Sequence, residues 1–243
     1  MDMKFKRVVH RIRRRLVSAP RDIYGQNFNT AVKFIGNDWF VNERIVEVAF
    51  ALRQISLETT AQRILEFGCA RSDLALQLAS FGYEVIGIDL RPYPFTHPNL
   101  QFKQINLLEF SDDIGFDYIT AISVIEHIGL GVYGEGQSRN DLKQVARKMG
   151  DLLKPNGKLI VTVPFGKAYE DQFLQSFTYE QITRLFARDD LKLDIEMYFC
   201  RHKLKHWQPC SREETITYSN AKIDRGPTGV NCVGCFVWQK KLS

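Results

Sequence analysis

The sequence predicts an α/β fold with a mostly parallel, doubly wound sheet, and three observations support this class. Short apolar runs rich in branched side chains recur from residue 63 onward. Amphipathic segments with helical spacing separate several of these runs. The chain has 243 residues and 44% hydrophobic content, which is enough to bury one substantial core. Strands that alternate with helices are typical of a parallel sheet with right-handed crossovers and helices on both faces.

The individual elements follow from these runs. Strands are expected at residues 63–67, 83–89, 100–105, 116–123 and 157–164. Helices are expected between them at residues 73–81 and 140–153, and the turn residues KPNG follow the second helix. The C-terminal part is expected to contain a helix near residues 178–187 and strands near residues 191–200 and 230–239, which form a hairpin with a long insertion.

Residues 1–58 are expected to form an N-terminal extension to a domain that spans residues 59–243. Residues 4–17 place apolar side chains at helical spacing opposite arginines, which predicts a basic amphipathic helix. Residues 18–30 carry turn formers and indicate a linker or lid. A second helix is expected from Asp38, which can cap it, to Ile55. Its apolar face would consist of Ile45, Val48, Ala49 and Leu52.

Charge is concentrated in the N-terminal arm. Up to Arg21 the chain carries eight Lys and Arg residues and one Asp, a net charge of +7, so the remaining 222 residues carry −2 of the total +5. A nearly neutral body argues against a large nucleic-acid-binding surface on it. The basic helix either packs on the body or contacts an anionic membrane or acidic partner.

The compartment is expected to be the cytoplasm. No apolar run reaches the ~18 residues that a membrane span needs, and the N-terminal segment lacks the apolar region of a signal peptide. The five cysteines are an odd number spread over the chain, which favours reduced thiols over a disulfide framework.

The turn after the first predicted strand indicates a nucleoside site. In such folds the backbone of this turn approaches the ligand, and Asp89, at the end of the next strand, can accept hydrogen bonds from ribose hydroxyls. A dinucleotide would need G-x-G-x-x-G, but from Gly68 the sequence reads G-x-A-x-x-D, and Asp73 would place a carboxylate beside the phosphates. Glu66 can instead orient an ammonium group. These features favour S-adenosylmethionine.

Five motifs in the correct order resemble those of class I S-adenosylmethionine-dependent methyltransferases, over about residues 60–200. The motifs are Glu66-x-Gly68-x-Ala70, Asp89, Asn106, FDYITAISVIEHIG from residue 116 and LLKPNGKLIVTVP from residue 152. The resemblance implies a seven-stranded, Rossmann-like sheet whose antiparallel last strand is NCVGCFVWQKK, from residue 231. It further implies that Glu66, Gly68 and Ala70 hold the methionine part and Asp89 the ribose. Leu90, Asn106 and Leu107 would hold the adenine, and Ser123 would lie beside the methionine end.

Three residues depart from the family pattern. Ala70 and Ser72 replace glycines, and Asn106 replaces a frequent aspartate. An alanine adds one methyl group and is tolerated at negative φ. An asparagine carbonyl can still accept a hydrogen bond from the adenine amino group. Cofactor binding is therefore expected to survive these changes.

Methyl transfer requires an aligned nucleophile and, for a hydroxyl acceptor, a group that accepts its proton. His127, after the fourth strand, is the candidate base, and Glu126 could orient it or another group. The alternative is that His127 only fixes its loop. Some O-methyltransferases bind a divalent ion through an E-x-x-E-H cluster, but Ser123 stands at the first glutamate, so no essential metal is expected.

The acceptor pocket is expected near residues 129–138, a segment with four glycines that is either a loop that reshapes around the acceptor or a surface connection. Phe165, Lys167 and Tyr169 lie at the same edge of the sheet. A zinc site is not expected, since Cys235 falls inside an apolar strand and a second C-x-x-C is missing; its ligands would come from Cys200, Cys210, Cys232, Cys235, His202 and His206.

The favoured function is O-methylation of a small-molecule, sugar or polysaccharide-type acceptor, of the kind found in bacterial methyltransferases that resemble this chain. Two alternatives stay open. One is an RNA methyltransferase that uses the basic arm as an electrostatic clamp. The other is a non-catalytic binding subunit that keeps the fold. A nicotinamide-dependent dehydrogenase ranks below both, because the glycine motif is incomplete.

Overall fold

A central sheet of eight strands organises the protein. The computed structural model describes residues 32–35, 38–55, 62–132, 138–202, 206–221 and 230–242. The strand order in the sheet is β11-β10-β12-β7-β6-β3-β4-β5. Its strands are β3 (Arg63–Phe67), β4 (Glu84–Asp89), β5 (Leu100–Gln104), β6 (Phe116–Ile122), β7 (Leu153–Pro164), β10 (Leu191–His202), β11 (His206–Cys210) and β12 (Cys232–Lys240).

Strands β5, β4, β3, β6 and β7 are parallel, and β12 is antiparallel to both β7 and β10. This arrangement confirms the predicted mostly parallel sheet with its antiparallel strand near the C-terminus. The five predicted strands correspond to β3 to β7, although β7 begins at Leu153 and includes the predicted KPNG turn. β3, β4, β6 and the second half of β7 are apolar runs buried on both faces, as parallel strands are, whereas β5 at the edge of the sheet is only partly buried. Two small hairpins lie outside the sheet, β1 (Val32–Ile35) with β2 (Asp38–Val41) and β8 (Tyr169–Glu170) with β9 (Gln175–Ser176).

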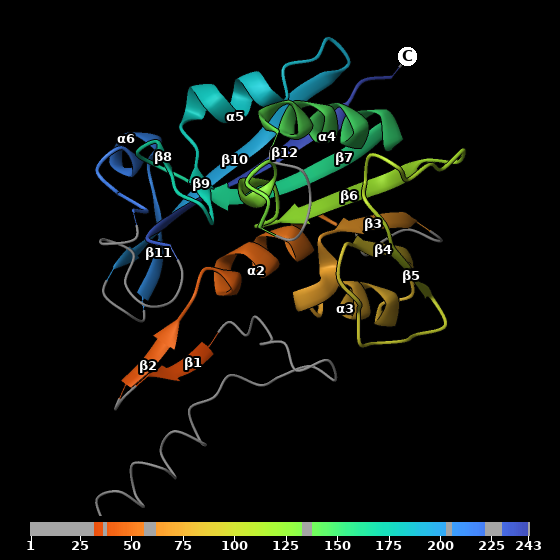
Figure 1. The fold of residues 1–243 in the computed structure, drawn as a ribbon, viewed down its shortest axis with the longest axis horizontal. Helices are drawn as coiled ribbons and strands as arrows, with labels where there is room; N and C mark the ends of the chain where they lie inside the picture. Colours follow the sequence, from red (N-terminus) through yellow and green to blue (C-terminus); the bar gives the residue numbers. More distant parts are fainter. Residues whose placement is uncertain are drawn as a thin grey trace, which may run out of the picture.

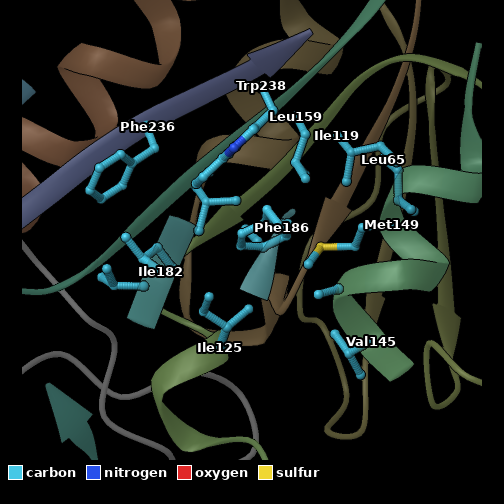
Figure 2. Packing of buried hydrophobic residues seen from close by; sticks show 14 of the residues in the cluster. Leu65, Ile119, Ile125, Val145, Met149, Leu159, Ile182, Phe186, Phe236 and Trp238 are labelled. Atoms are coloured by element: carbon cyan, nitrogen blue, oxygen red, sulfur yellow. The ribbon is translucent and has the colours of Figure 1, made fainter. Parts of the chain in front are cut away.

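Helices cover both faces of the sheet (Figure 1). On one face lie α2 (Arg44–Gln54) and α3 (Leu74–Ser80), and on the other lie α4 (Arg139–Leu152) and α5 (Tyr179–Leu185). Alternate residues of β3 divide between the two faces: Ile64 packs with α2 and α3, and Leu65 packs with α4 and α5. Figure 2 shows the apolar cluster on the side of α4 and α5, in which Phe186 lies in the middle, between Met149, Ile182 and Trp238.

The eighth strand, β11, and the short helix α6 (Arg212–Thr215) occupy the expected long insertion between β10 and β12. Strand β11 adds to the seven predicted strands at the edge of the sheet, where it pairs antiparallel with β10. Its sequence, HWQPC, is polar and contains Pro209, and proline within a sheet is tolerated on an edge strand. The run of apolar residues that marks the buried strands is absent from it.

The N-terminal helix prediction was partly wrong. Residues Asp38–Val41 form strand β2, and the helix begins at Arg44, whose N–H donates to Oδ1 of Asn42 at 3.1 Å. Its buried face is also different from the expected one. Ile45 is 45% exposed, whereas Glu47, Phe50 and Ala51 are buried. The expected face was wrong because one position of the buried face is the polar residue Glu47, so the pattern of apolar residues alone points to a different side of the helix.

The expectation of reduced thiols was wrong for one pair. Cys200 and Cys210 form a disulfide across β10 and β11, with their Cα atoms 6.1 Å apart. Strand pairing that the sequence pattern did not indicate brings the two residues together. Cys69, Cys232 and Cys235 are free and buried, as expected for cysteines inside apolar strands and turns.

The basic segment 4–17, the segment 18–30 and residues 133–137 of the glycine-rich loop lie outside the described residues. The contact of residues 4–17 with a membrane, the body or a nucleic acid therefore stays a prediction. Among the described helices, none has the length and apolar character that crossing a membrane requires.

Candidate active site

The turn after β3 depends on a glycine at residue 68. Its φ of +82° lies in the left-handed region, and its N–H donates to the carbonyl oxygen of Ile88 at 2.8 Å. A Cβ at this position would lie 2.3 Å from Cγ2 of Val124. The turn therefore packs tightly against β4 and the segment after β6. It lies at the carboxyl edge of the sheet, where ligands bind in such folds.

Glu66 places a buried carboxyl group beside this turn. It is 2% exposed, and its Oε2 has no hydrogen-bond partner among the described residues. Burial raises the pKa of the Glu66 carboxyl to about 7, and this rise is opposed in part by the hydroxyl of Ser72 and the charge of Arg44. A buried carboxyl oxygen without a partner is suited to a cationic ligand group.

Asp89 ends β4 and accepts four hydrogen bonds from the protein. Its Oδ2 accepts from the N–H of Ala70 at 2.9 Å and from Nη2 of Arg91 at 3.1 Å. Its Oδ1 accepts from the N–H of Arg91 at 2.9 Å and from Nε of Arg91 at 3.0 Å. An ionised carboxylate has about four acceptor positions. The two backbone donors orient this one, and the Arg91 guanidinium occupies the other two positions.

The residues expected at the adenine lie beyond β4 and β5, the ends of which are joined by a hydrogen bond from Ile105 N–H to the Asp89 carbonyl at 3.1 Å. Leu90 is half-buried and Leu107 is buried. Oδ1 of Asn106 accepts the N–H of Leu108 at 2.9 Å, which fixes the orientation of the Asn106 amide. The side chain keeps a second lone pair and two donors for a ligand.

Helix α2 contributes two residues that the sequence analysis did not assign. Glu47 is buried, and its Oε1 accepts the hydroxyl of Ser123 at 2.6 Å. Arg44 donates through Nη1 to the carbonyl of Ile122 at 2.6 Å and lies 3.4 Å from Oε2 of Glu47. Burial raises the pKa of Glu47, and Arg44 lowers it in part. In the sequence, the one feature that could have identified Glu47 is its position as a glutamate among the apolar residues of this helix.

This contact fixes the end of β6. Ser123 has a φ of +49°, and its N–H donates to both the carbonyl and the Oγ1 of Thr162 at 3.1 Å. A non-glycine residue with positive φ is uncommon and persists when its surroundings hold it. The hydrogen bonds from Ser123 to Glu47 and Thr162 stabilise this backbone conformation, directly before the segment with Glu126 and His127.

His127 and Glu126 form the short helix η2 (Ile125–His127) after β6. Nδ1 of His127 lies 2.6 Å from the carbonyl oxygen of Phe173, and the two rings meet edge to face at 5.1 Å. Nε2 of His127 lies 3.8 Å from Oε1 of Glu126, which is too long for a hydrogen bond. Glu126 is buried, and its Oε2 has no partner in the described part of the chain. The residue that orients His127 is thus Phe173, which the sequence analysis missed.

Comparison with known families decides the identity of this arrangement. A sequence profile for a family described as a methyltransferase domain matches residues 40–207, which is more than half of the chain. The chain belongs to this methyltransferase family. It is an S-adenosylmethionine-dependent enzyme with the class I fold. A comparison with curated protein sequences finds no match.

Solved structures similar to this methyltransferase support the fold. One is a SAM-dependent methyltransferase from Methanosarcina mazei, with 16% identity and a TM-score of 0.54 over 80% of this chain and 98% of the other. Another is 1,6-didemethyltoxoflavin-N1-methyltransferase from Burkholderia thailandensis, with bound 1,6-didemethyltoxoflavin and S-adenosylhomocysteine. It has 13% identity and a TM-score of 0.57 over 83% and 80%. The [4+2]-cyclase SpnF has 13% identity and a TM-score of 0.59 over 90% of each chain. At these identities the likeness concerns the fold, which hosts more than one reaction.

The residues at the carboxyl edge of the methyltransferase fit S-adenosylmethionine. The unpartnered Oε2 of Glu66 suits the ammonium group, and two acidic residues near the turn, Glu66 and Asp73, disfavour a pyrophosphate. Asp89 suits the ribose hydroxyls if the Arg91 side chain releases its two acceptor positions. The individual cofactor-binding roles, including those of Leu90, Asn106, Leu107 and Ser123, stay predictions.

The other expectations for this region have different outcomes. Phe165 is 1% exposed and packs against Tyr198 and Phe236 at ring distances of 5.0 and 5.6 Å, so it is a core residue and does not line an acceptor pocket. The hydroxyl of Tyr169 donates to Asp171 at 3.1 Å. Over the described ranges, the one group with metal-ligand spacing is that of the three cysteines at positions 200, 210 and 232, two of which form the disulfide.

Opposite effects on cofactor affinity are expected from substitutions at the paired residues Asp89 and Arg91. Asp89→Ala removes the ribose acceptor and is expected to weaken S-adenosylhomocysteine binding by about 1.5–3 kcal/mol. Arg91→Ala frees two acceptor positions of Asp89 and is expected to strengthen binding by at least about threefold, since the ribose no longer displaces a charged donor. Isothermal titration measures both. Weaker binding by Arg91→Ala would show that Arg91 contacts the cofactor instead of competing with it.

Proposed function

We propose that the methyltransferase modifies an oxygen atom of a small-molecule or sugar-type acceptor and that His127 accepts the proton of the reacting hydroxyl. The observation that carries this proposal is the 2.6 Å contact between Nδ1 of His127 and the carbonyl of Phe173. A carbonyl oxygen only accepts hydrogen bonds, so Nδ1 carries the proton. In the neutral imidazole the lone pair then lies on Nε2, and this nitrogen is set up as a proton acceptor.

Glu126 is a buried carboxyl group beside the proposed base. Burial holds the pKa of its carboxyl group well above the usual range, and the nearby charge of Glu47 raises it further. Burial therefore favours the neutral form of this carboxyl group, and its Oε1 atom, 3.8 Å from Nε2 of His127, is too far away for a hydrogen bond to the imidazole. We therefore assign Glu126 to the buried wall beside the imidazole, while the carbonyl of Phe173 orients the ring.

The other requirement of methyl transfer is that the protein aligns the acceptor with the methyl group. Bound S-adenosylmethionine supplies a methyl group already activated for displacement, so the protein needs to position the acceptor, exclude water and accept one proton. Arg44 and Glu47 hold Ile122 and Ser123 at the end of β6. His127 follows four residues later on η2, so α2 positions the base through this strand end.

The chemistry is tested with S-adenosylmethionine labelled with carbon-13 in its methyl group. Monosaccharides, sugar phosphates, phenols and their amino counterparts serve as acceptors, and the carbon chemical shift of the product distinguishes O–CH₃ from N–CH₃. We expect O–CH₃ products. Transfer to nitrogen alone would overturn the proposal; the name of the Burkholderia thailandensis N1-methyltransferase gives a nitrogen as the methylated atom for that enzyme. RNA as the only labelled acceptor would favour the alternative based on the basic arm.

A further inference from the structure

A groove of about 410 Å³ lies between α4 and α5, on the face of the sheet opposite α2. Figure 1 shows these two helices along the same face of the sheet. Leu142 and Leu185 come from the helices, and Phe177 and the segment 128–130 line the groove between them. The volume is within the ~300–1,000 Å³ typical of small-molecule pockets, and apolar walls with a few polar groups are typical of such sites.

Two chain segments connect the groove to His127. Residues 128–130 follow His127 directly, and Gln175 and Phe177 follow Phe173, whose carbonyl contacts the imidazole. The two segments are joined within the groove wall by a hydrogen bond from Nε2 of Gln175 to the carbonyl of Ile128, at 3.4 Å. The groove therefore begins within a few residues of the proposed base, on both sides of the His127–Phe173 contact.

Positively charged side chains that are unpaired in the described part of the chain line this groove. Lys143, Arg147 and Arg184 are exposed, and their side chains form no ion pair or hydrogen bond with the described residues. Arg188, also in the lining, differs because it is paired with Asp151 at 2.7 Å and Asp190 at 2.8 Å. The two carboxylates in the lining, Glu170 and Glu180, do not balance the three unpaired cations. An excess of like charges around one groove is repulsive, and an anionic ligand relieves this repulsion.

We propose that the groove binds an anionic group of the acceptor, a carboxylate or a phosphate, while the reacting hydroxyl of the same molecule lies at His127. This inference rests on the proposed function, because it takes His127 as the place of reaction. Arg147 and Arg184 suit the anion, since a guanidinium can donate two hydrogen bonds to one carboxylate or phosphate. Leu142, Phe177 and Leu185 contact the apolar part of the acceptor. The substrate class is thus a small hydroxylated acid or a phosphorylated sugar.

The test compares the double variant Arg147→Gln/Arg184→Gln with the control Lys148→Gln, a cation on the same helix that does not line the groove. Binding is measured by titration with glucose 6-phosphate, with glucose and inorganic phosphate as separate probes. We expect the wild type and the control to bind the sugar phosphate, and the double variant to bind it at least about tenfold more weakly. Unchanged affinity for S-adenosylhomocysteine in all three proteins shows that the fold and the cofactor site are intact.

The probes separate the sources of the effect. Equal binding of the sugar phosphate by the double variant and the wild type, or no binding by any protein, would overturn the groove proposal. If inorganic phosphate binds as tightly as the sugar phosphate, the groove is an anion site that does not recognise the rest of the acceptor. This result would also contradict the groove proposal. Because this measurement needs no turnover, it is independent of the carbon-13 experiment. An N–CH₃ product with intact groove binding would reject O-methylation and keep the groove.

Discussion

Replacement of His127 by alanine is expected to lower kcat by about 10²–10⁴-fold, the usual contribution of a positioned general base. The imidazole is held through Nδ1 by the Phe173 carbonyl, so its loss removes the proton acceptor without touching the turn at Gly68 or the carboxylate of Asp89. Cofactor affinity is therefore expected to stay within about twofold, a free-energy change below 0.5 kcal/mol. Initial rates with an O-methylated acceptor and titration with S-adenosylhomocysteine measure the two quantities.

Two controls separate a base from a residue that only fixes its loop. His97→Ala removes another imidazole, whose Nδ1 accepts the N–H of Asn99 at 3.1 Å, and should leave kcat unchanged. Phe173→Ala keeps the backbone carbonyl that orients His127 but removes the ring contact. It should therefore cost less activity than His127→Ala. Full activity of His127→Ala would exclude the base role, and a parallel fall in melting temperature and cofactor affinity would indicate a structural one.

The sequence predicted the part of the fold that repeats a simple pattern. Strands β3, β4, β6 and the second half of β7 are apolar runs buried on both faces, so each was visible from composition alone. Strand β11 was not, because HWQPC has neither alternation nor branched residues and is held by pairing with β10. The start of α2 was misplaced because Asp38 is a good capping residue by type, whereas Asn42 provides the hydrogen bond.

The residues of the candidate site likewise fall into those that the sequence pattern identified and those that it missed. Glu66, Gly68 and Asp89 are identifiable because they sit at the ends of predicted strands, where the topology places ligands. Arg44 and Glu47 were missed because their role depends on a contact with Ile122 and Ser123, more than 70 residues away in the chain. The backbone carbonyl of Phe173 carries no side-chain signal at all. Roles set by long-range hydrogen bonds need the structure.

Glu66 is expected to make cofactor affinity strongly dependent on pH. With its pKa raised to about 7 by burial, the carboxyl group is protonated at pH 5 and ionised at pH 8. The cofactor's ammonium group favours the ionised form, so binding must release a proton below pH 7. Each pH unit below the pKa then costs about a factor of ten. The affinity for S-adenosylhomocysteine should therefore rise up to about 100-fold between pH 5 and pH 7 and level off above. Titration in two buffers of different ionisation enthalpy detects the released proton.

The stability of the cofactor-free protein should show the opposite trend from the same residue. An unfolded glutamate ionises at its ordinary pKa of 4.5, whereas the folded protein keeps the proton until about pH 7. The folded state binds more protons in this window, so the Glu66 contribution falls by about 3 kcal/mol as pH rises through it. Glu66→Gln, with no proton to lose, should flatten both profiles and weaken binding at pH 8 by about 10- to 100-fold. If affinity and stability instead change with pH in the same direction, or if Glu66→Gln keeps both slopes, the carboxyl group does not bind the ammonium.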